Sequence, residues 1–206
     1  MKWIGLTGGI ACGKSTVSQI LRRFGRVVID ADQLARDVVQ VGTPGLAEVV
    51  QAFGPDILQA DQSLDRQKIA SLVFHDPAKL KKLESILHPR IRTLTIEKRK
   101  LAEKAGEESA FYDVPLLFEK AMEKQFDLIV VVACPAPIQI SRLIQRNGLS
   151  RLDAEARIKA QLPMDDKIIR ADFTVMNTGK PEELELEVRK LLAFVDGRQA
   201  QVTKPK

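Results

Sequence analysis

Five short apolar runs are spaced along the chain, and each has the length and composition of a buried β-strand. The run from Phe126 to Ala133 is nearly continuous in apolar residues, as expected for a strand covered on both faces of a parallel sheet. The five runs occupy residues 1–7, 26–30, 109–114, 126–133 and 173–176. Stretches with helical spacing separate them. The pattern therefore predicts an α/β fold, in which helices cover both faces of a parallel five-stranded sheet.

The helical stretches carry recognisable start and stop signals. Thr43 and Pro44 predict the N-cap and first residue of a helix that Gly54 ends. Ser150 and Asp153 have the spacing of a capping box. The predicted helices cover residues 15–24, 33–40, 44–53, 137–146, 150–163 and 181–195. The tail from Asp196 to Lys206 is predicted to be disordered.

Residues 64–105 contain no convincing strand. Ser63 opens one amphipathic run, which extends to Phe74, and Asp76-Pro77 opens another. The pair His88-Pro89 is predicted to interrupt the second run, and a further helix extends to Gly106. We therefore expect residues 37–105 to form a helical insertion between two strands.

Composition and charge narrow the class of protein. The chain has 206 residues, 45% hydrophobic and 29% charged, which suits one α/β domain with a small inserted subdomain. No apolar run approaches a membrane span and no signal-peptide pattern is present, so we expect a cytoplasmic protein without a membrane partner. Cys12 and Cys134 are too few for a disulfide scaffold. The net charge of +5 is compatible with nucleic acid or, equally, with polyphosphate substrates.

Residues 8–15 match the phosphate-binding pattern G-x-x-x-x-G-K-[ST], and they lie between a predicted strand and a predicted helix. Glycines allow successive N–H groups to point into one anion hole, and the helix adds the positive end of its dipole. Lys14 would reach the β- and γ-phosphates, and the Ser15 hydroxyl would take one place on Mg²⁺. The alternative, a glycine turn that binds nothing, does not require these flanking elements. We expect a nucleoside triphosphate site.

The rest of the sequence restricts the kind of nucleotide-binding protein. The chain has no guanine-specifying N-K-x-D segment and no L-S-G-G-Q-like signature. These absences argue against a GTPase and against a transporter ATPase. A small phosphotransferase with a mobile lid remains.

Carboxylates follow two of the predicted strands. Asp30 and Asp32 come after the second strand and Asp113 ends the third. Ligands of open α/β sheets bind at the carboxyl ends of strands, and a kinase acting on an alcohol needs a carboxylate to orient the hydroxyl and accept its proton. Asp32 could do this, while Asp30 or Asp113 orders magnesium-bound water. From spacing alone, Asp30 and Asp32 could equally cap the following helix.

Arginines gather in the predicted helices after the fourth strand. Arg142 and Arg146 lie four residues apart on one helix face, Arg157 follows on the next helix, and Gln161 lies one turn later. Cations that close over the phosphates stabilise the charge on the transferring group. Residues 148–167 would form the lid that brings them in. The competing interpretation is an exposed helix that carries arginines for solubility.

His88 has no metal partner at suitable spacing. We interpret it as a structural or substrate-contacting residue in preference to a catalytic one.

Taken together, several segments resemble one family in their order and spacing. They are Leu6-Thr7-Gly8-Gly9-Ile10 leading into Gly13-Lys14-Ser15-Thr16; Val28-Ile29-Asp30-Ala31-Asp32 with Ala35-Arg36; Leu64-Asp65-Arg66 with Val73-Phe74; Leu83-Glu84 with Ile86 and His88-Pro89; Val114 to Glu119; Gln139, Arg142-Leu143 and Arg146; Arg157-Ile158 with Ala160-Gln161; and Ala171-Asp172 with Asn177 and Gly179. This series resembles the dephospho-coenzyme A kinases, a family of P-loop kinases. The resemblance covers about residues 3–180.

The resemblance implies a reaction and a set of roles. The family transfers phosphate from ATP to the ribose 3′-hydroxyl of dephospho-CoA, the last step of coenzyme A synthesis, with Mg²⁺ as cofactor. Asp32 would be the base, acting with Lys14 and Arg142. The implied ATP-binding residues are Gly8, Gly9, Ile10, Ala11, Cys12, Gly13, Lys14, Ser15, Thr16, Arg146, Asn177 and Gly179. The implied acceptor-binding residues are Thr7, Asp32, Arg66, His88, Leu116, Leu117, Phe118, Arg157 and Gln161.

The same resemblance implies a division of the chain. Residues 1–36, 106–147 and 168–206 would form the nucleotide-binding core, residues 37–105 the acceptor subdomain and residues 148–167 the lid. We expect ATP and dephospho-CoA as partners, no nucleic acid, and a monomer or weak homo-oligomer.

Two residues depart from the family pattern. Asn147 stands where the family usually has Asp, which puts an ion pair there in doubt, and Cys12 replaces a small residue. The open alternatives are a kinase for a nucleoside, a nucleotide or another small alcohol, and a nucleotide-dependent RNA-binding regulator.

Overall fold

The structure, a computed structural model, describes residues 1–197, and the chain divides into two compact units. The first unit comprises Met1–Val28 and the chain from Ala105 onward, and the second comprises Ile29–Lys104. The predicted tail lies outside the described residues except at its start. There the prediction of disorder is wrong for Asp196, because Arg26 donates hydrogen bonds of 2.8 and 2.6 Å to its two carboxylate oxygens.

The first unit is built on a five-stranded sheet with the order β2-β3-β1-β4-β5. The strands are β1 (Lys2–Gly8), β2 (Val27–Asp30), β3 (Ser109–Asp113), β4 (Leu128–Ala133) and β5 (Phe173–Met176). Strand β1 pairs in parallel with both β3 and β4, and β4 pairs in parallel with β5. The register places Leu6 beside Asp113 and Gly8 beside Val132, so the ends of β1, β3 and β4 meet at one edge of the sheet.

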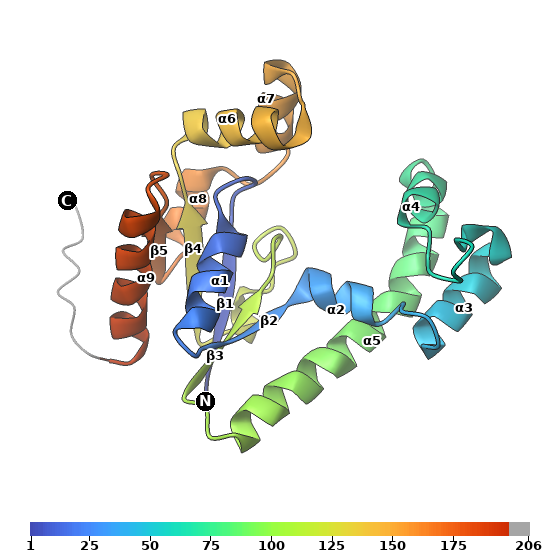
Figure 1. Ribbon diagram of the computed structural model, residues 1–206, viewed down its shortest axis with the longest axis horizontal. Helices are drawn as coiled ribbons and strands as arrows, with labels where there is room; N and C mark the ends of the chain where they lie inside the picture. The colour runs from blue at the N-terminus through green and yellow to red at the C-terminus, as the bar shows by residue number, and fades with distance from the viewer. Residues whose placement is uncertain (198–206) are drawn as a thin grey trace. The chain divides into compact units, whose positions relative to one another are not determined.

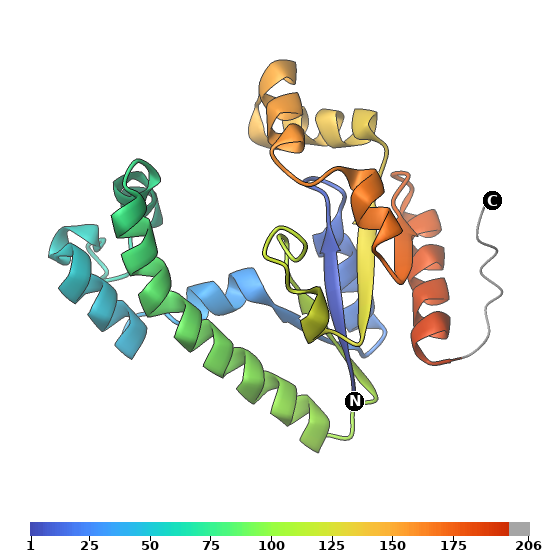
Figure 2. The same cartoon turned by 180° about the vertical axis from the view of Figure 1, so that it is seen from behind.

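Helices cover both faces of this sheet (Figures 1 and 2). The helices of this unit are α1 (Lys14–Arg23), α6 (Ala136–Asn147), α7 (Arg151–Lys159), α8 (Met164–Ile169) and α9 (Pro181–Val195), with a 3₁₀ turn, η2, at Glu123–Gln125. Of these, α6 and α7 pack together beyond the carboxyl ends of the strands, at the top of Figure 1. Helices α1 and α9 pack together, and α8 packs against β4. Their apolar faces enclose a core that includes Ile4, Leu6, Val17, Val130 and Leu191. The predicted fold class is confirmed, although α8 is an element that the sequence pattern did not predict.

Two aspartates extend the hydrogen bonding of the strands. Asp127 accepts a hydrogen bond of 2.7 Å from the backbone N–H of Trp3, and Asp172 accepts one of 2.7 Å from that of Ile129. Asp127 immediately precedes β4, and Asp172 immediately precedes β5. Each carboxylate therefore satisfies an N–H group near the start of the neighbouring strand.

The second unit is helical, as the absence of strand patterns predicts. It contains the end of β2, then α2 (Ala31–Asp37), α3 (Pro44–Phe53), a 3₁₀ turn, η1 (Pro55–Ile57), α4 (Arg66–Phe74) and α5 (Pro77–Lys104). Helices α2, α3 and α4 each pack on α5. The buried side chains between them are Val38, Val39, Val49, Ile57, Ile69, Val73 and Ile86. Thr43 caps α3 as predicted, accepting a hydrogen bond of 3.2 Å from the N–H of Leu46.

Three boundaries in this unit differ from the prediction. Helix α2 covers Ala31–Asp37, where residues 33–40 were expected. Helix α5 continues through Pro89, where an interruption was expected (Figure 1). Pro89 and Ser85, whose carbonyl loses its usual N–H donor, are both exposed, so that carbonyl can be hydrated. Ile86 and its neighbours on the opposite side hold the helix to the core. Helix α4 begins at Arg66 and is capped by Asp65, so Ser63 does not open it.

No helix within residues 1–197 combines the length and apolar character that crossing a membrane requires.

We predict that Asp172→Ala lowers the free energy of unfolding by about 1–3 kcal/mol, because it leaves the buried N–H of Ile129 without its acceptor. Urea denaturation followed by circular dichroism measures the change. The control is Glu108→Ala at an exposed side chain, expected to stay within about 0.5 kcal/mol of the unmodified protein. An equal effect of both substitutions would contradict this role of Asp172.

Candidate active site

The loop between β1 and α1 has the backbone of a phosphate-binding turn. Gly13, the residue before α1, has φ 88° and ψ 26°, and Ala11 has φ 59°. Left-handed conformations are rare for residues other than glycine and cluster at functional sites, so the value at Ala11 marks this turn. In the first turn of α1 the N–H of Thr16 is bonded to the carbonyl of Gly13 at 3.0 Å. The N–H groups of Lys14 and Ser15 come too early in the helix to have such an acceptor, which leaves them for an anion.

Three side chains hold three successive carbonyl groups of this loop. Gln139 donates to the carbonyl of Ile10 at 2.8 Å, Arg142 to that of Ala11 at 3.1 Å, and Asn177 to that of Cys12 at 2.8 Å. In a trans peptide the C=O and the following N–H point in opposite directions. The N–H groups of Ala11 and Gly13 therefore point away from these side chains, toward the inside of the turn.

The side chains that hold the loop are themselves connected. Arg142 donates to the Asn177 side-chain oxygen at 3.1 Å, and the same oxygen accepts the N–H of Gly179 at 3.2 Å. Gln161 reaches the loop from beyond α7 and accepts the N–H of Ile10 at 2.8 Å. The structure thus brings Arg142, Gln161 and Asn177 together at the phosphate loop.

Gly13 is required at its position for two reasons. Its positive φ disfavours any L side chain, and a Cβ atom there would lie 2.2 Å from the Asn177 side-chain nitrogen. Close approach of Asn177 to the loop therefore depends on the missing side chain.

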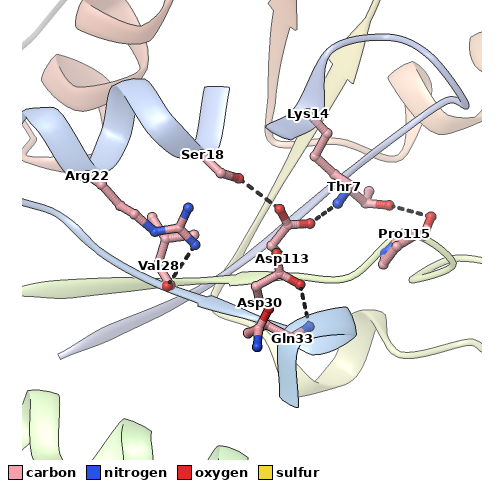
Figure 3. Close-up of polar contacts among 9 residues, drawn as sticks. All are labelled: Thr7, Lys14, Ser18, Arg22, Val28, Asp30, Gln33, Asp113 and Pro115. Atoms are coloured by element: carbon pink, nitrogen blue, oxygen red, sulfur yellow. Dashed lines mark hydrogen bonds and ion pairs between the residues drawn. The ribbon is translucent and has the colours of Figure 1, made fainter. Parts of the chain in front are cut away.

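Lys14 forms an ion pair with Asp113 at the carboxyl end of β3 (Figure 3). The Asp113 side chain is only 2% exposed, and its other oxygen accepts a hydrogen bond of 2.8 Å from the Ser18 hydroxyl. Both carboxylate oxygens are thus occupied, as a buried charge requires. Thr7 donates to the carbonyl of Pro115 at 3.1 Å, which holds the chain that leaves β3 (Figure 3). Ser15 and Thr16 lie exposed in the first turn of α1.

The remaining predicted residues of the first unit are spread more widely. Arg146 is exposed and donates to the side-chain oxygen of Asn147 at 3.0 Å, so the amide forms a hydrogen bond where the family's carboxylate is missing. Arg157 is exposed on α7. In the segment after β3, Leu116 is 40% exposed, whereas Leu117 and Phe118 are buried.

Four predicted residues belong to the second unit. Asp30 caps α2, accepting a hydrogen bond of 3.0 Å from the N–H of Gln33 (Figure 3), and Asp32 is exposed in the first turn. His88 is exposed on α5. Arg66, the first residue of α4, lines a pocket of about 830 Å³ within this unit. The other lining residues are Arg36, Val39, Gln40, Val41, Gln59, Ser63, Leu64, Asp65 and Gln67.

Sequence reasoning did not assign roles to several residues that shape the site. Gln139 lies three residues before Arg142 on the same face of α6, a spacing that could have paired them. Ser18 lies one helical turn after Lys14, so its contact with Asp113 follows from the same logic. The ammonium nitrogen of Lys167 also lies 2.7 Å from a carboxylate oxygen of Glu119. No local sequence pattern predicts this pair.

The two cysteines meet beneath the phosphate loop. The Cys134 sulfur lies 3.3 Å from the Cys12 sulfur, and both side chains are buried. The hydrogen bond with Cys134 and the burial together raise the pKa of Cys12 far above its ordinary value. Cys12 is therefore a protonated packing residue at neutral pH.

A phosphate loop whose lysine meets a carboxylate at the end of a neighbouring strand, in a five-stranded parallel sheet, defines a P-loop kinase. A family model described as dephospho-CoA kinase (CoaE) matches residues 2–183. The chain therefore belongs to the dephospho-CoA kinase family. This confirms the predicted enzyme, a kinase of the final step of coenzyme A biosynthesis.

Individual relatives agree with the family assignment. Dephospho-CoA kinase of Anaeromyxobacter dehalogenans is 47% identical over 197 residues, which cover 96% of this chain and 93% of that protein. The crystal structure of TT1252 from Thermus thermophilus has a TM-score of 0.75 at 37% identity, covering 94% of this chain and 97% of the other. Dephospho-CoA kinase from Campylobacter jejuni has a TM-score of 0.68 at 27% identity, with the same coverage.

We predict that Cys12 resists alkylation by iodoacetamide in the folded protein near neutral pH, because its thiol is buried and its pKa is raised. Peptide mass spectrometry would show Cys12 unmodified in buffer and modified in guanidinium chloride. Reaction at the same rate in both conditions would contradict the description of Cys12 as a buried, protonated thiol.

Proposed function

We propose that this chain transfers the γ-phosphoryl group of ATP to the ribose 3′-hydroxyl of dephospho-CoA, with the residue roles given below. The observation that carries the proposal is the phosphate loop, in which side chains hold the carbonyl groups of Ile10, Ala11 and Cys12. This arrangement leaves the N–H groups of Ala11, Gly13, Lys14 and Ser15 to bind phosphate. Family membership supports the choice of the two substrates.

The donor side is supplied by the loop and the residues that hold it. The N–H groups of Ala11, Gly13, Lys14 and Ser15 would bind the phosphates, and Lys14 would exchange part of its contact with Asp113 for the β- and γ-phosphates. Arg142 donates to the carbonyl of Ala11. Its guanidinium would leave this carbonyl when ATP binds and turn toward the transferring group, whose charge it would stabilise. Asn177 and Gly179 would border the adenine, close to Arg142.

The residues around Lys14 fit a magnesium ion. Mg²⁺ prefers hard oxygen ligands and usually takes one or two from the protein and the rest from phosphates and water. The exposed hydroxyl of Ser15 would be the direct protein ligand, and Asp113 or Asp30 would hold bound water. Among residues 1–197, no group of three or more His, Cys, Asp or Glu is arranged to hold a metal ion. When bound, Mg²⁺ would neutralise phosphate charge.

The acceptor side is supplied by the second unit. Asp32 and Arg36 lie four residues apart on α2 and so share one face of the helix. Arg36 also lines the 830 Å³ pocket with Arg66. Two arginines suit the diphosphate of dephospho-CoA, and the apolar lining at Val39, Val41 and Leu64 suits its uncharged arm.

The chemical step assigns Asp32 as the base. Its exposed carboxylate would accept a hydrogen bond from the 3′-hydroxyl, orient the oxygen toward the γ-phosphate and take the proton as the bond to phosphorus forms. Asp113, which pairs with Lys14, or Asp30, the cap of α2, would hold the magnesium-bound water.

The lid assignment completes the proposal. Residues 148–167, with Arg157 on α7 and Gln161 at the phosphate loop, would close over the phosphates and exclude water. The role of residues 37–105 as acceptor subdomain, with His88 on its surface, belongs to the same proposal. We also infer a cytoplasmic monomer or weak homo-oligomer.

The proposal is tested by an acceptor panel. We expect the purified protein with ATP and Mg²⁺ to phosphorylate dephospho-CoA at least about a hundredfold more efficiently than nucleosides or nucleotides, measured as kcat/KM by coupled ADP release. Preference for a nucleoside would reject the acceptor assignment. Salt-sensitive RNA binding without turnover of any acceptor would favour a regulatory module.

For Asp32→Asn we predict that kcat falls by about 10²–10⁴ while ATP affinity is retained, because the amide can orient the hydroxyl but cannot take its proton. Steady-state kinetics and ATP titration by calorimetry separate the two effects. Asp37→Asn, on the same helix, is the control and should keep near-normal turnover. Near-normal turnover of Asp32→Asn would remove Asp32 from the base role.

A further inference from the structure

A charged pair joins the segment that follows β3 to helix α8. Lys167 has a fully buried side chain, and its ammonium nitrogen lies 2.7 Å from a carboxylate oxygen of Glu119. Glu119 closes the segment Val114–Phe118, which begins one residue after Asp113, the partner of Lys14. The two residues are 48 positions apart in the sequence, since 167 − 119 = 48, and both belong to the first unit.

Further contacts reinforce this junction. The same Glu119 oxygen accepts the N–H of Leu162 at 3.2 Å, so one carboxylate holds both Leu162, which precedes α8, and Lys167 within α8. Both residues lie in the last part of the proposed lid. The Arg170 guanidinium lies 4.6 Å from the centre of the Phe118 ring and also pairs with Glu123. The junction therefore fixes the segment after β3 from its far end, while Thr7 fixes its near end at Pro115.

The charges of Glu119 and Lys167 stabilise one another. Burial by itself would raise the pKa of Glu119, but the ion pair with Lys167 and the hydrogen bond from the N–H of Leu162 outweigh it, and the pKa is lowered. Glu119 is therefore ionised at neutral pH. Burying the Lys167 ammonium without this carboxylate would be strongly unfavourable. The side chain of Lys167 therefore has little freedom to move away from Glu119.

We propose that Glu119 and Lys167 are a positioning pair, which holds Leu116–Phe118 in the conformation that receives the acceptor and ties this segment to the end of the lid. The pair would act through the segment that it holds and not by contact with a substrate. The proposal rests on the proposed function and on the acceptor contacts that the family resemblance implies for Leu116–Phe118, of which Leu116 is the exposed residue.

The test is Lys167→Met, which keeps the length of the side chain and removes its charge. We expect the KM for dephospho-CoA to rise about 10- to 100-fold, while the KM for ATP changes less than about threefold. Lys167→Arg, which keeps the charge, should recover most of the acceptor affinity. The melting temperature of each variant is measured first. Assays run well below that temperature separate the change in KM from unfolding.

Lys190→Met is the matched control. Lys190 lies on α9, outside the proposed lid, and pairs with Glu187 at 2.6 Å, but its side chain is 50% exposed, so its loss should change neither KM. If Lys167→Met does not fold, Glu119→Gln provides the second variant, because its amide oxygen can still accept the N–H of Leu162.

Hydrogen exchange provides a readout independent of turnover. In Lys167→Met the amides of residues 116–122 should exchange faster, with those of α1 unchanged. A melting temperature that falls while both KM values and this exchange stay unchanged would overturn the positioning role, as would an equal rise of both KM values. If the unmodified protein does not phosphorylate dephospho-CoA, the proposed function fails, whereas faster exchange would still identify the junction.

Discussion

The site depends on one backbone requirement: a loop that binds phosphate must turn its N–H groups inward, so its carbonyl groups need partners on the other side. Three side chains from α6 and the end of β5 meet this need at Ile10, Ala11 and Cys12. Gln139, Arg142 and Asn177 all lie in the later half of the chain, far from the loop in sequence. The loop therefore takes its shape only when the sheet is assembled. Binding of phosphate then requires little rearrangement of the backbone.

Two buried ion pairs lie on either side of the segment that leaves β3. Lys14 meets Asp113 before it, and Lys167 meets Glu119 after it. The first pair places a cation beside the phosphate loop, and the second fixes the segment proposed to receive the acceptor. The same short stretch of chain therefore connects the donor and acceptor halves of the proposed reaction, with a buried charge at each end.

Sequence pattern predicted the strands and the class of fold because apolar runs and helical spacing are local signals. Thr43 and Gly54 marked the ends of α3 correctly for the same reason. Pro89 misled the prediction, since its helix is held by packing of the opposite face, which local pattern does not report. The contacts of Gln139 and Ser18 agree with helical spacing, but they could be predicted only once the group that each side chain contacts was known. The Glu119–Lys167 pair could not be predicted, because only the folded chain brings residues so far apart together.

Gly13 illustrates how tightly the loop constrains change in this family of folds. Its backbone conformation disfavours a side chain, and the space that a Cβ would occupy is already filled by Asn177. The two obstacles are independent, so shortening Asn177 would remove one and leave the other, while also releasing the carbonyl of Cys12. An evolutionary path through position 13 would therefore need changes at several sites at once, none of which helps alone. Gly13 is therefore constrained by its dependence on Asn177 as much as by its own backbone conformation.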